Sequence, residues 1–127
     1  MRLLLDTHAL LWAAKGTLAK DACALVEDTG NELFFSPVNL WEIQLKRAHL
    51  NLDPRVFYQD LLNSGYREIE LTSRHVLNLA QLPQLHQDPF DRILLSQALS
   101  EQVFLLTADK VLWQYHKYSD CIIFFEQ

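Results

Sequence analysis

The chain has 127 residues and a formal net charge of −5, and 50% of its residues are hydrophobic. This length and balance fit one globular domain over residues 1–127 that buries a core without disulfides or a structural metal. The acidic charge argues against binding of a polyanion over a broad basic surface, and only 3 glycines are present, too few for a glycine-rich dinucleotide loop or a Walker A loop.

The first third of the chain alternates between strand and helix patterns. Residues 2–6 are a short apolar run that ends in an acid, which is typical of a buried central strand. Gly16 and Gly30 are suitable helix stops, and Ser36 with Pro37 offers a cap and a first helical residue. We predict strands at 2–6 and 32–36, and helices at 7–15, at 18–29 and from Pro37 to residue 50.

The rest of the chain continues this alternation. Gly65 ends an amphipathic segment, Pro83 breaks the next helical pattern, and Asp88 with Pro89 repeats the start signal of a cap followed by proline. We predict helices at 55–64, 72–82 and 89–101 and a short one at 107–116, with strands at 67–71, 102–106 and 121–125.

The predicted order of elements is βααβααβααβαβ. Strands that alternate with helices are joined by right-handed crossovers into a parallel sheet with helices on both faces. The sequence therefore predicts an α/β fold with three α/β/α layers around a central, mostly parallel five-stranded sheet. In such sheets ligands bind at the carboxyl ends of the strands, near the point where the strand order reverses.

The start of the chain and its two cysteines give information about the cellular localisation of the protein. Asp6 and His8 interrupt the apolar run that a signal peptide would need. Cys23 and Cys121 lie far apart and outside any C-x-x-C pattern, which excludes a zinc ribbon and a dithiol redox motif. No stretch reaches the ~18 apolar residues of a membrane span. We expect a soluble, cytoplasmic protein.

Two acidic residues have positions that fit a functional site. Asp6 follows the first strand and falls at its carboxyl end, although an aspartate there also caps the next helix. Glu42 lies four residues after Val38 and three before Leu45, in line with the apolar stripe of its helix. A carboxylate on a core-facing stripe must be paired, protonated or bound to a metal. Alternatively, Glu42 lies at the edge of the stripe and reaches solvent.

Asp91 and Asp109 each fall in the first turn of a predicted helix, where the helix dipole alone favours an acid. A parallel sheet would bring Asp6, Asp109 and the start of the Asp91 helix to one edge, with Glu42 facing them. Two charges about 4 Å apart repel by about 4 kcal/mol at an effective dielectric of about 20, so such a cluster needs a cation. Oxygen ligands without convergent Cys or His favour Mg²⁺ or Mn²⁺, and such an ion suits phosphoryl chemistry.

Four segments carry a resemblance to a known family. They are LLLDTHALLWA at the start, SPVNLWEIQLK in the first third, HQDPFDRILLSQAL near residue 90 and FLLTADK near the end. In these segments, and over essentially the whole chain, the sequence resembles the PIN domain ribonucleases, and more narrowly the VapC-like toxins of bacterial toxin–antitoxin pairs. The combination of DTHALLW with DPFDR is specific.

This resemblance implies a set of site residues and an activity. Asp6, Glu42, Asp91 and Asp109 would be the catalytic and metal-binding acids, and Thr107 would keep a hydroxyl near the site. The implied activity is Mg²⁺- or Mn²⁺-dependent cleavage of RNA phosphodiester bonds by activated water, as in an endoribonuclease. The resemblance also implies a homodimer and a partner antitoxin protein that blocks the RNA groove.

An acidic protein that cuts RNA still needs local positive charge. Arg92, beside Asp91, fits contact with an RNA phosphate and pairing with a buried carboxylate equally well. Solvated helix faces explain Lys46 and Arg47 better than RNA binding does, and Lys110, beside Asp109, is a further candidate.

The histidines and tryptophans carry weaker signals. Packing at a helix start explains His8 better than a role as general base. The other histidines have no metal-ligand spacing and are expected at the surface; they are His49, His75, His86 and His116. The tryptophans lie on amphipathic helices, where core or dimer packing explains them better than base stacking; they are Trp12, Trp41 and Trp113.

Two other functions fit parts of the sequence. A PIN-fold binding module without catalysis would act only through an interface, but the complete set of acids argues against it. A phospho-receiver domain has a similar length and fold class. However, a receiver needs a paired acid after the first strand, where Asp6 is followed by Thr7 and His8.

Overall fold

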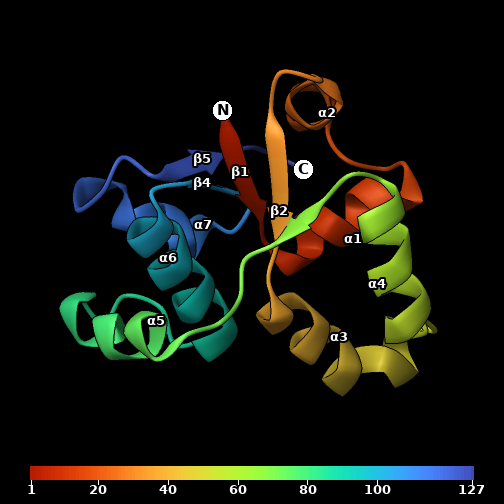
Figure 1. Cartoon of the computed structure of the whole chain (residues 1–127). Coiled ribbons are helices and arrows are strands. Elements are labelled where there is room, and N and C mark those ends of the chain that lie inside the picture. Colours follow the sequence, from red (N-terminus) through yellow and green to blue (C-terminus); the bar gives the residue numbers. More distant parts are fainter.

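A five-stranded sheet lies at the centre of the computed structural model, which describes residues 1–127 (Figure 1). Its strands are β1 (Arg2–Leu5), β2 (Glu32–Phe35), β3 (Arg67–Glu68), β4 (Phe104–Thr107) and β5 (Ile122–Phe124). All neighbouring strands are parallel, in the order β3-β2-β1-β4-β5. The predicted α/β fold is confirmed. The strand order differs from the 2-1-3-4-5 order of a receiver, which removes that alternative.

Seven α-helices connect the strands in the predicted order. They are α1 (Thr7–Lys15), α2 (Lys20–Glu27), α3 (Pro37–Leu50), α4 (Pro54–Asn63), α5 (Ser73–Leu77), α6 (Pro89–Glu101) and α7 (Lys110–Trp113). Short 3₁₀ helices, η1 (Asn78–Gln81) and η2 (Gln114–Lys117), continue α5 and α7. No helix combines the length and the apolar character that crossing a membrane requires.

Some element boundaries differ from the prediction. β3 is two residues long, where we expected a strand over 67–71, because its partner β2 ends at Phe35 and gives way to α3. The helix expected over 72–82 is a short α-helix continued by η1. Helix α2 ends at Glu27, before Gly30, whose N–H donates to the Asp28 carboxylate in the turn that follows (2.9 Å).

Capped helix starts gather at the carboxyl edge of the sheet. Asp6 caps α1, Ser36 caps α3, Asp88 caps α6 and Asp109 caps α7, and each side chain accepts a hydrogen bond from an N–H in the first turn. These bonds satisfy donors that have no partner within the helix. Asp6 and Asp109 are thereby fixed next to the ends of β1 and β4.

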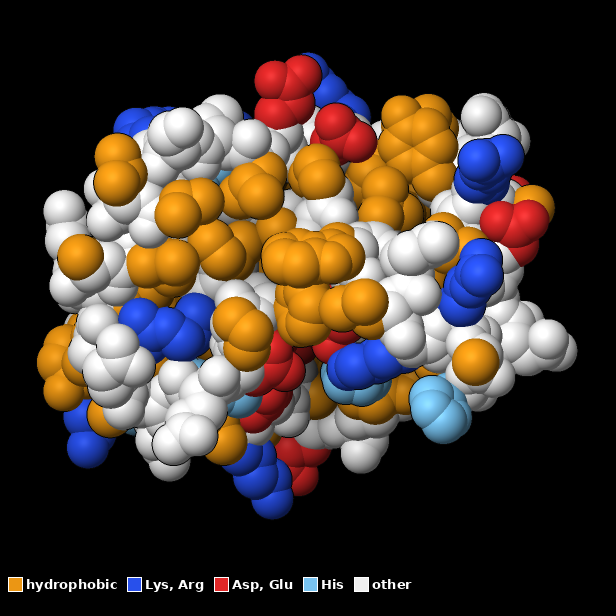
Figure 2. All heavy atoms as spheres, turned by 90° about the horizontal axis from the view of Figure 1, so that it is seen from below, with side chains coloured by type: hydrophobic (Ala, Val, Ile, Leu, Met, Phe, Trp, Pro, Cys, Tyr) orange, Lys and Arg blue, Asp and Glu red, His pale blue; other side chains and the backbone are white.

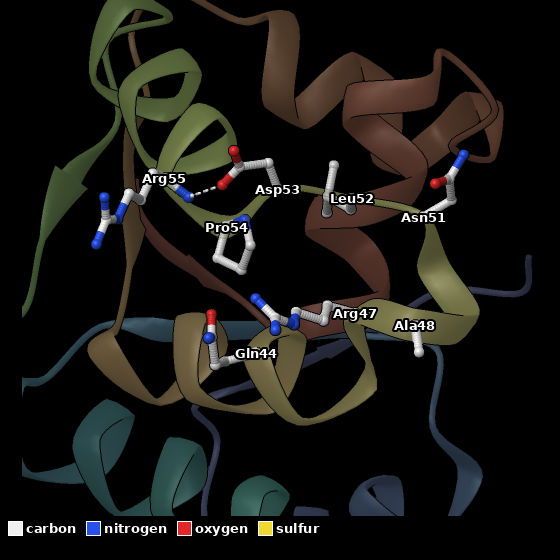
Figure 3. A pocket seen from close by; sticks show the side chains of 8 residues that line it. All are labelled: Gln44, Arg47, Ala48, Asn51, Leu52, Asp53, Pro54 and Arg55. Atoms are coloured by element: carbon white, nitrogen blue, oxygen red, sulfur yellow. Dashed lines mark hydrogen bonds between the residues drawn. The ribbon is translucent and has the colours of Figure 1, made fainter.

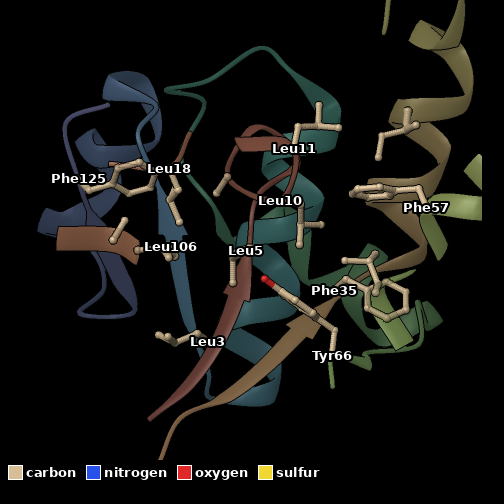
Figure 4. Packing of buried hydrophobic residues seen from close by; sticks show 14 residues of the cluster. Leu3, Leu5, Leu10, Leu11, Leu18, Phe35, Phe57, Tyr66, Leu106 and Phe125 are labelled. Atoms are coloured by element: carbon tan, nitrogen blue, oxygen red, sulfur yellow. The ribbon is translucent and has the colours of Figure 1, made fainter. Parts of the chain in front are cut away.

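Alternate strand residues face two cores, one on each side of the sheet. Leu3 and Leu5 pack with residues of α1, α2 and α4 (Figure 4), whereas Leu4 packs with residues of α6 and α7. All three leucines are fully buried, and replacing a leucine at such a site with alanine costs about 2–5 kcal/mol. The sheet is therefore the rigid middle layer of the predicted three, and its carboxyl edge is a stable platform for a site.

Candidate functional site

The predicted acidic residues gather at the carboxyl ends of β1 and β4, the two strands between which the strand order reverses. Asp6 directly follows β1 and Asp109 lies just beyond β4. Asp91 comes from the first turn of α6, and Glu42 comes from α3. Figure 2 looks onto this edge and shows carboxylates in a hollow, bordered by hydrophobic side chains and by Lys or Arg and His side chains.

Thr107 connects Asp6 with the backbone of Asp109. Its hydroxyl donates to Asp6 Oδ2 and accepts a hydrogen bond from the Asp109 N–H (3.0 Å). The other oxygen of Asp6, Oδ1, accepts from the Ala9 N–H (2.8 Å). Asp6 and Thr107 are both buried. Burial raises the pKa of Asp6 to about 6, against the lowering effect of the two hydrogen bonds.

Asp91, Asp109 and His86 form a compact group of possible metal ligands. Each residue offers one ligand atom, and these atoms all lie within 4.8 Å of one another. His86 Nε2 lies 3.0 Å from Asp91 Oδ2 and 2.9 Å from Asp109 Oδ2. The second oxygen of Asp109, Oδ1, accepts from the Val111 N–H (2.8 Å). One imidazole nitrogen therefore contacts both carboxylates.

The two aspartates of this group have pKa values shifted in opposite directions. Burial raises the pKa of Asp91, and the hydrogen bond with Asp109 and the negative charge of Asp88 raise it further. Burial also acts to raise the pKa of Asp109, but hydrogen bonds from His86, Asp91 and Val111 together outweigh burial and lower it. Without a cation, the crowded pair therefore keeps a proton on Asp91.

Glu42 is buried on α3 and has one unpaired oxygen. Its side chain is only 3% exposed, and Oε2 accepts from Lys46 Nζ at 2.7 Å. Oε1 is buried without a hydrogen-bond partner. Of the two alternatives for Glu42, the core-facing position is correct. Lys46, which we expected on a solvated face, uses its ammonium group to pair with this carboxylate.

The structure brings the four predicted acids together to different degrees. Asp91 and Asp109 belong to one ligand group, and Asp6 lines a hollow of about 240 Å³ together with Asp109. Glu42 is outside the 4.8 Å group. Its connection runs through Lys46, whose pKa is raised by the hydrogen bond with Glu42 and also by the charge of Asp91.

Two histidines that we expected at the surface are in fact packed into the structure. His86 lies in the loop before α6, and its side chain is 12% exposed. His75 is fully buried, with Nδ1 accepting from the Thr72 N–H (3.1 Å) at the start of α5. Both expectations were wrong because each ring bonds to nearby backbone N–H groups. Such local contacts create no metal-ligand spacing in the sequence, although T-S-R-H is a variant of a helix capping box with His at its last position.

Arg92 makes its hydrogen bonds inside the protein. Its guanidinium donates to the carbonyl oxygens of Pro83 (3.1 Å) and Leu79 (3.3 Å) and to the Tyr115 hydroxyl (3.2 Å). These bonds connect the segment before α6 with Tyr115, which belongs to the core on the α6 and α7 side of the sheet. His8 is exposed in the first turn of α1, with its ring centroid 5.7 Å from that of Trp12.

A wider cavity, of about 730 Å³, lies away from the carboxylate group, between the end of α3 and the start of α4 (Figure 3). Polar side chains line it, including Arg47 and Arg55. Its one carboxylate, that of Asp53, accepts from the Arg55 N–H (3.0 Å) and caps α4. Because this cavity has a single carboxylate and no group of possible metal ligands, we place the candidate site at the carboxyl edge of the sheet.

Comparison with known proteins identifies a family and several similar structures. A model of the PIN domain family matches residues 3–117. No curated protein sequence matches the chain. Three solved structures are similar over 98% or 99% of both chains: VapBC2 from Rickettsia felis bound to a promoter DNA fragment (TM-score 0.67, 17% identity), a toxin–antitoxin complex from Klebsiella pneumoniae (0.69, 16%) and VapBC-1 from nontypeable Haemophilus influenzae (0.68, 16%).

Proposed function

The chain belongs to the PIN domain family, and on this basis we propose that it is an endoribonuclease that uses Mg²⁺ or Mn²⁺ to hydrolyse RNA phosphodiester bonds. The observation that carries the proposal is the convergence of Asp91 and Asp109 on one point at the strand-order reversal. Asp6 is held beside them by Thr107. Residues 1–127 form a single domain in this proposal.

The side chains at this edge fit a hard divalent cation. Carboxylate oxygens are the ligands that Mg²⁺ and Mn²⁺ prefer. Oε1 of Glu42 is buried with no partner, which is costly unless a cation compensates it. Burial raises the pKa of Asp91, and the neighbouring acids raise it further, as expected of a buried carboxylate group that lacks a cation. We propose that the metal is held by Asp6, Glu42, Asp91 and Asp109.

The bound cation would lower the pKa of a water molecule and stabilise negative charge on the phosphate oxygens. The residues of the chain position the carboxylates for this work. A hydrogen bond from the first turn of α1 holds one oxygen of Asp6, and a hydrogen bond from the first turn of α7 holds one oxygen of Asp109. Lys46 adds a positive charge next to Glu42, half-exposed and within reach of an RNA phosphate. Arg92 acts indirectly, by fixing the segment that leads into α6.

We further propose that the chain is the toxin of a VapBC-type pair, inhibited by a cognate antitoxin protein, and that it acts in the cytoplasm as a homodimer. The similar structure from Klebsiella pneumoniae is a toxin–antitoxin complex, which supports a protein partner here. Helix α3 exposes Trp41 (58%) and Leu45 (64%). Together with the hydrophobic band visible in Figure 2, these side chains support a protein interface near the site.

The test is cleavage of total cellular RNA by purified, partner-free protein with Mg²⁺ or Mn²⁺. We expect discrete fragments that disappear with EDTA and with Asp91→Asn. Asp60→Asn, which changes an exposed acid of α4, is the matched control and should cleave like the wild type. If folded wild-type protein that binds Mn²⁺ leaves all RNA intact, the nuclease proposal is wrong and a binding module is favoured.

A further inference from the structure

His86 is a chemically active side chain that the acidic set does not include. It precedes the N-cap of α6 by two residues, and its Nε2 lies 3.0 Å from Asp91 Oδ2 and 2.9 Å from Asp109 Oδ2. The question is whether Nε2 of His86 presents a lone pair to the space between these two oxygens, as a metal ligand would, or a hydrogen atom.

The other ring nitrogen answers this question. His86 Nδ1 lies 3.1 Å from the backbone nitrogen of Asp88, whose N–H donates to it. Nδ1 must therefore carry the lone pair, so the hydrogen of the neutral ring is on Nε2. Nε2–H donates to Oδ2 of Asp109, and Oδ2 of Asp91 lies 3.0 Å from the same nitrogen. For His86 to bind a metal through Nε2, the hydrogen would have to move to Nδ1 and face the Asp88 N–H, donor against donor.

His86 contacts Oδ2 of Asp109, which is also the oxygen of Asp109 that remains available to a cation. Oδ1 of Asp109 accepts from the Val111 and Leu112 N–H groups at the start of α7 (2.8 and 3.4 Å), so Oδ2 is the oxygen that faces the group. Oδ2 of Asp91 points to the same place. A cation that used both Oδ2 atoms would meet the positive end of the Nε2–H bond.

A hollow next to the His86 ring offers space into which the ring can move. A hollow of about 380 Å³ is lined by His86 and by its loop neighbours Gln84 and Gln87, with Pro89 and Arg92 from the start of α6. The largely buried ring borders this hollow, so rotation about its own side-chain bonds can carry it there.

We propose that His86 takes the place of the cation in the metal-free protein: its Nε2–H donates to Asp109 Oδ2 next to Asp91 Oδ2, and the ring leaves both aspartates when a divalent ion binds. The proposal rests on the metal site of the proposed function. His86 is thus a positioning residue that competes with the metal, and it lowers the affinity of the site for the ion.

The experiment measures Mn²⁺ affinity by calorimetry for wild-type protein and two variants. His86→Leu removes the donor and keeps most of the bulk, and we expect it to bind Mn²⁺ about tenfold more tightly, a change that corresponds to about 1.4 kcal/mol. His86→Gln keeps an N–H donor at the end of the side chain and should stay within about threefold of the wild type. Without metal, His86→Leu should also melt at a lower temperature.

A measurement on the unmodified protein covers the case in which His86→Leu does not fold. Nitrogen-15 chemical shifts of the imidazole should report hydrogen on Nε2 in the metal-free protein and a shift of both nitrogens when Mg²⁺ is added. Hydrogen on Nδ1 would overturn the proposal.

Weaker Mn²⁺ binding by His86→Leu would make His86 a ligand, and unchanged binding would make it a bystander; both results contradict the proposal. RNA cleavage separates this failure from that of the proposed function. A wild-type protein that cleaves RNA with Mn²⁺ but binds the ion regardless of His86 loses only the inference, whereas one that binds no Mn²⁺ at all loses both.

Discussion

Replacing Thr107 with valine tests whether its hydroxyl organises the site. Valine matches threonine in shape but removes the donor to Asp6 Oδ2 and the acceptor of the Asp109 N–H. A hydrogen bond to a charged group contributes about 1.5–3 kcal/mol, and a backbone N–H left without its partner costs about 1 kcal/mol more. Because Thr107 is fully buried, water cannot replace either bond. We expect a loss of about 3 kcal/mol in the free energy of unfolding at pH 7.

The assay is urea unfolding followed by circular dichroism, with thermal melting as a second measurement. A loss of about 3 kcal/mol in a domain of this length lowers Tm by about 10 °C. Thr107→Ser is the matched control, because it keeps the hydroxyl and removes only a methyl group, at a cost of about 1 kcal/mol. The valine variant should also bind Mn²⁺ less tightly than the serine variant, since Asp6 is no longer held in place.

The dependence of this effect on pH makes the test sharper. Burial raises the pKa of Asp6 to about 6, so at pH 4.5 the carboxyl of the wild-type protein is largely protonated and its bond with Thr107 is weaker. The difference between the valine and serine variants should therefore shrink at pH 4.5. A valine variant as stable as the serine variant at pH 7 would refute the reasoning that Thr107 supports a charged Asp6.

Three further predictions follow from the same group of carboxylates. Because burial raises the pKa of Asp6 from 3.8 to about 6, the folded metal-free protein binds a proton that the unfolded chain loses, so Asp6 alone should lower the free energy of unfolding by about 2.5 kcal/mol between pH 4 and 7. Asp91, whose pKa burial also raises, should add to this fall; Mg²⁺ should reduce it, and a flat profile without metal would contradict both shifts. Asp91→Asn should abolish RNA cleavage yet leave the metal-free protein about as stable as wild type, because asparagine is neutral like the protonated Asp91 and keeps a donor next to Asp109; a drop in Tm of about 10 °C would argue against a protonated Asp91. Lys46→Met should destabilise the protein by about 3 kcal/mol by leaving the Glu42 carboxylate buried and unpaired, and the double variant with Glu42→Gln should regain most of this loss in urea unfolding.

The order of the elements was predictable because each strand and helix carries its own signal. All strands but β3 contain short apolar runs, which are most completely buried in β1 and β4, and Pro37 and Pro89 each follow a capping residue at a helix start. Asp6 and Asp109 were found for the same reason: in a parallel sheet, a residue just after a strand is placed at the carboxyl edge by the strand itself.

Other features depend on the path of the chain in space, and the sequence pattern does not report them. His86 reaches the aspartates from the loop before α6, and no periodicity in the sequence describes such a loop. The length of β3 depends on where its partner β2 ends. The Glu42–Lys46 pair is different, since a spacing of four residues on a helix is a recognisable signal for an ion pair. Only the burial of Glu42, which makes that pair important, required the structure.

The two helix-capping aspartates also affect how an inactive form of this protein should be made. In Asp6 and Asp109, one carboxylate oxygen accepts from the first turn of a helix while the other faces Thr107 or His86. Alanine would remove both oxygens and cost about 1 kcal/mol through the lost cap. Asparagine keeps an oxygen for the cap, removes the charge and replaces only the second oxygen, which faces Thr107 or His86, with an amide NH₂ group. An inactive protein for trapping RNA or an antitoxin should therefore carry asparagine at these positions, so that any loss of binding reports on the partner and not on a frayed helix.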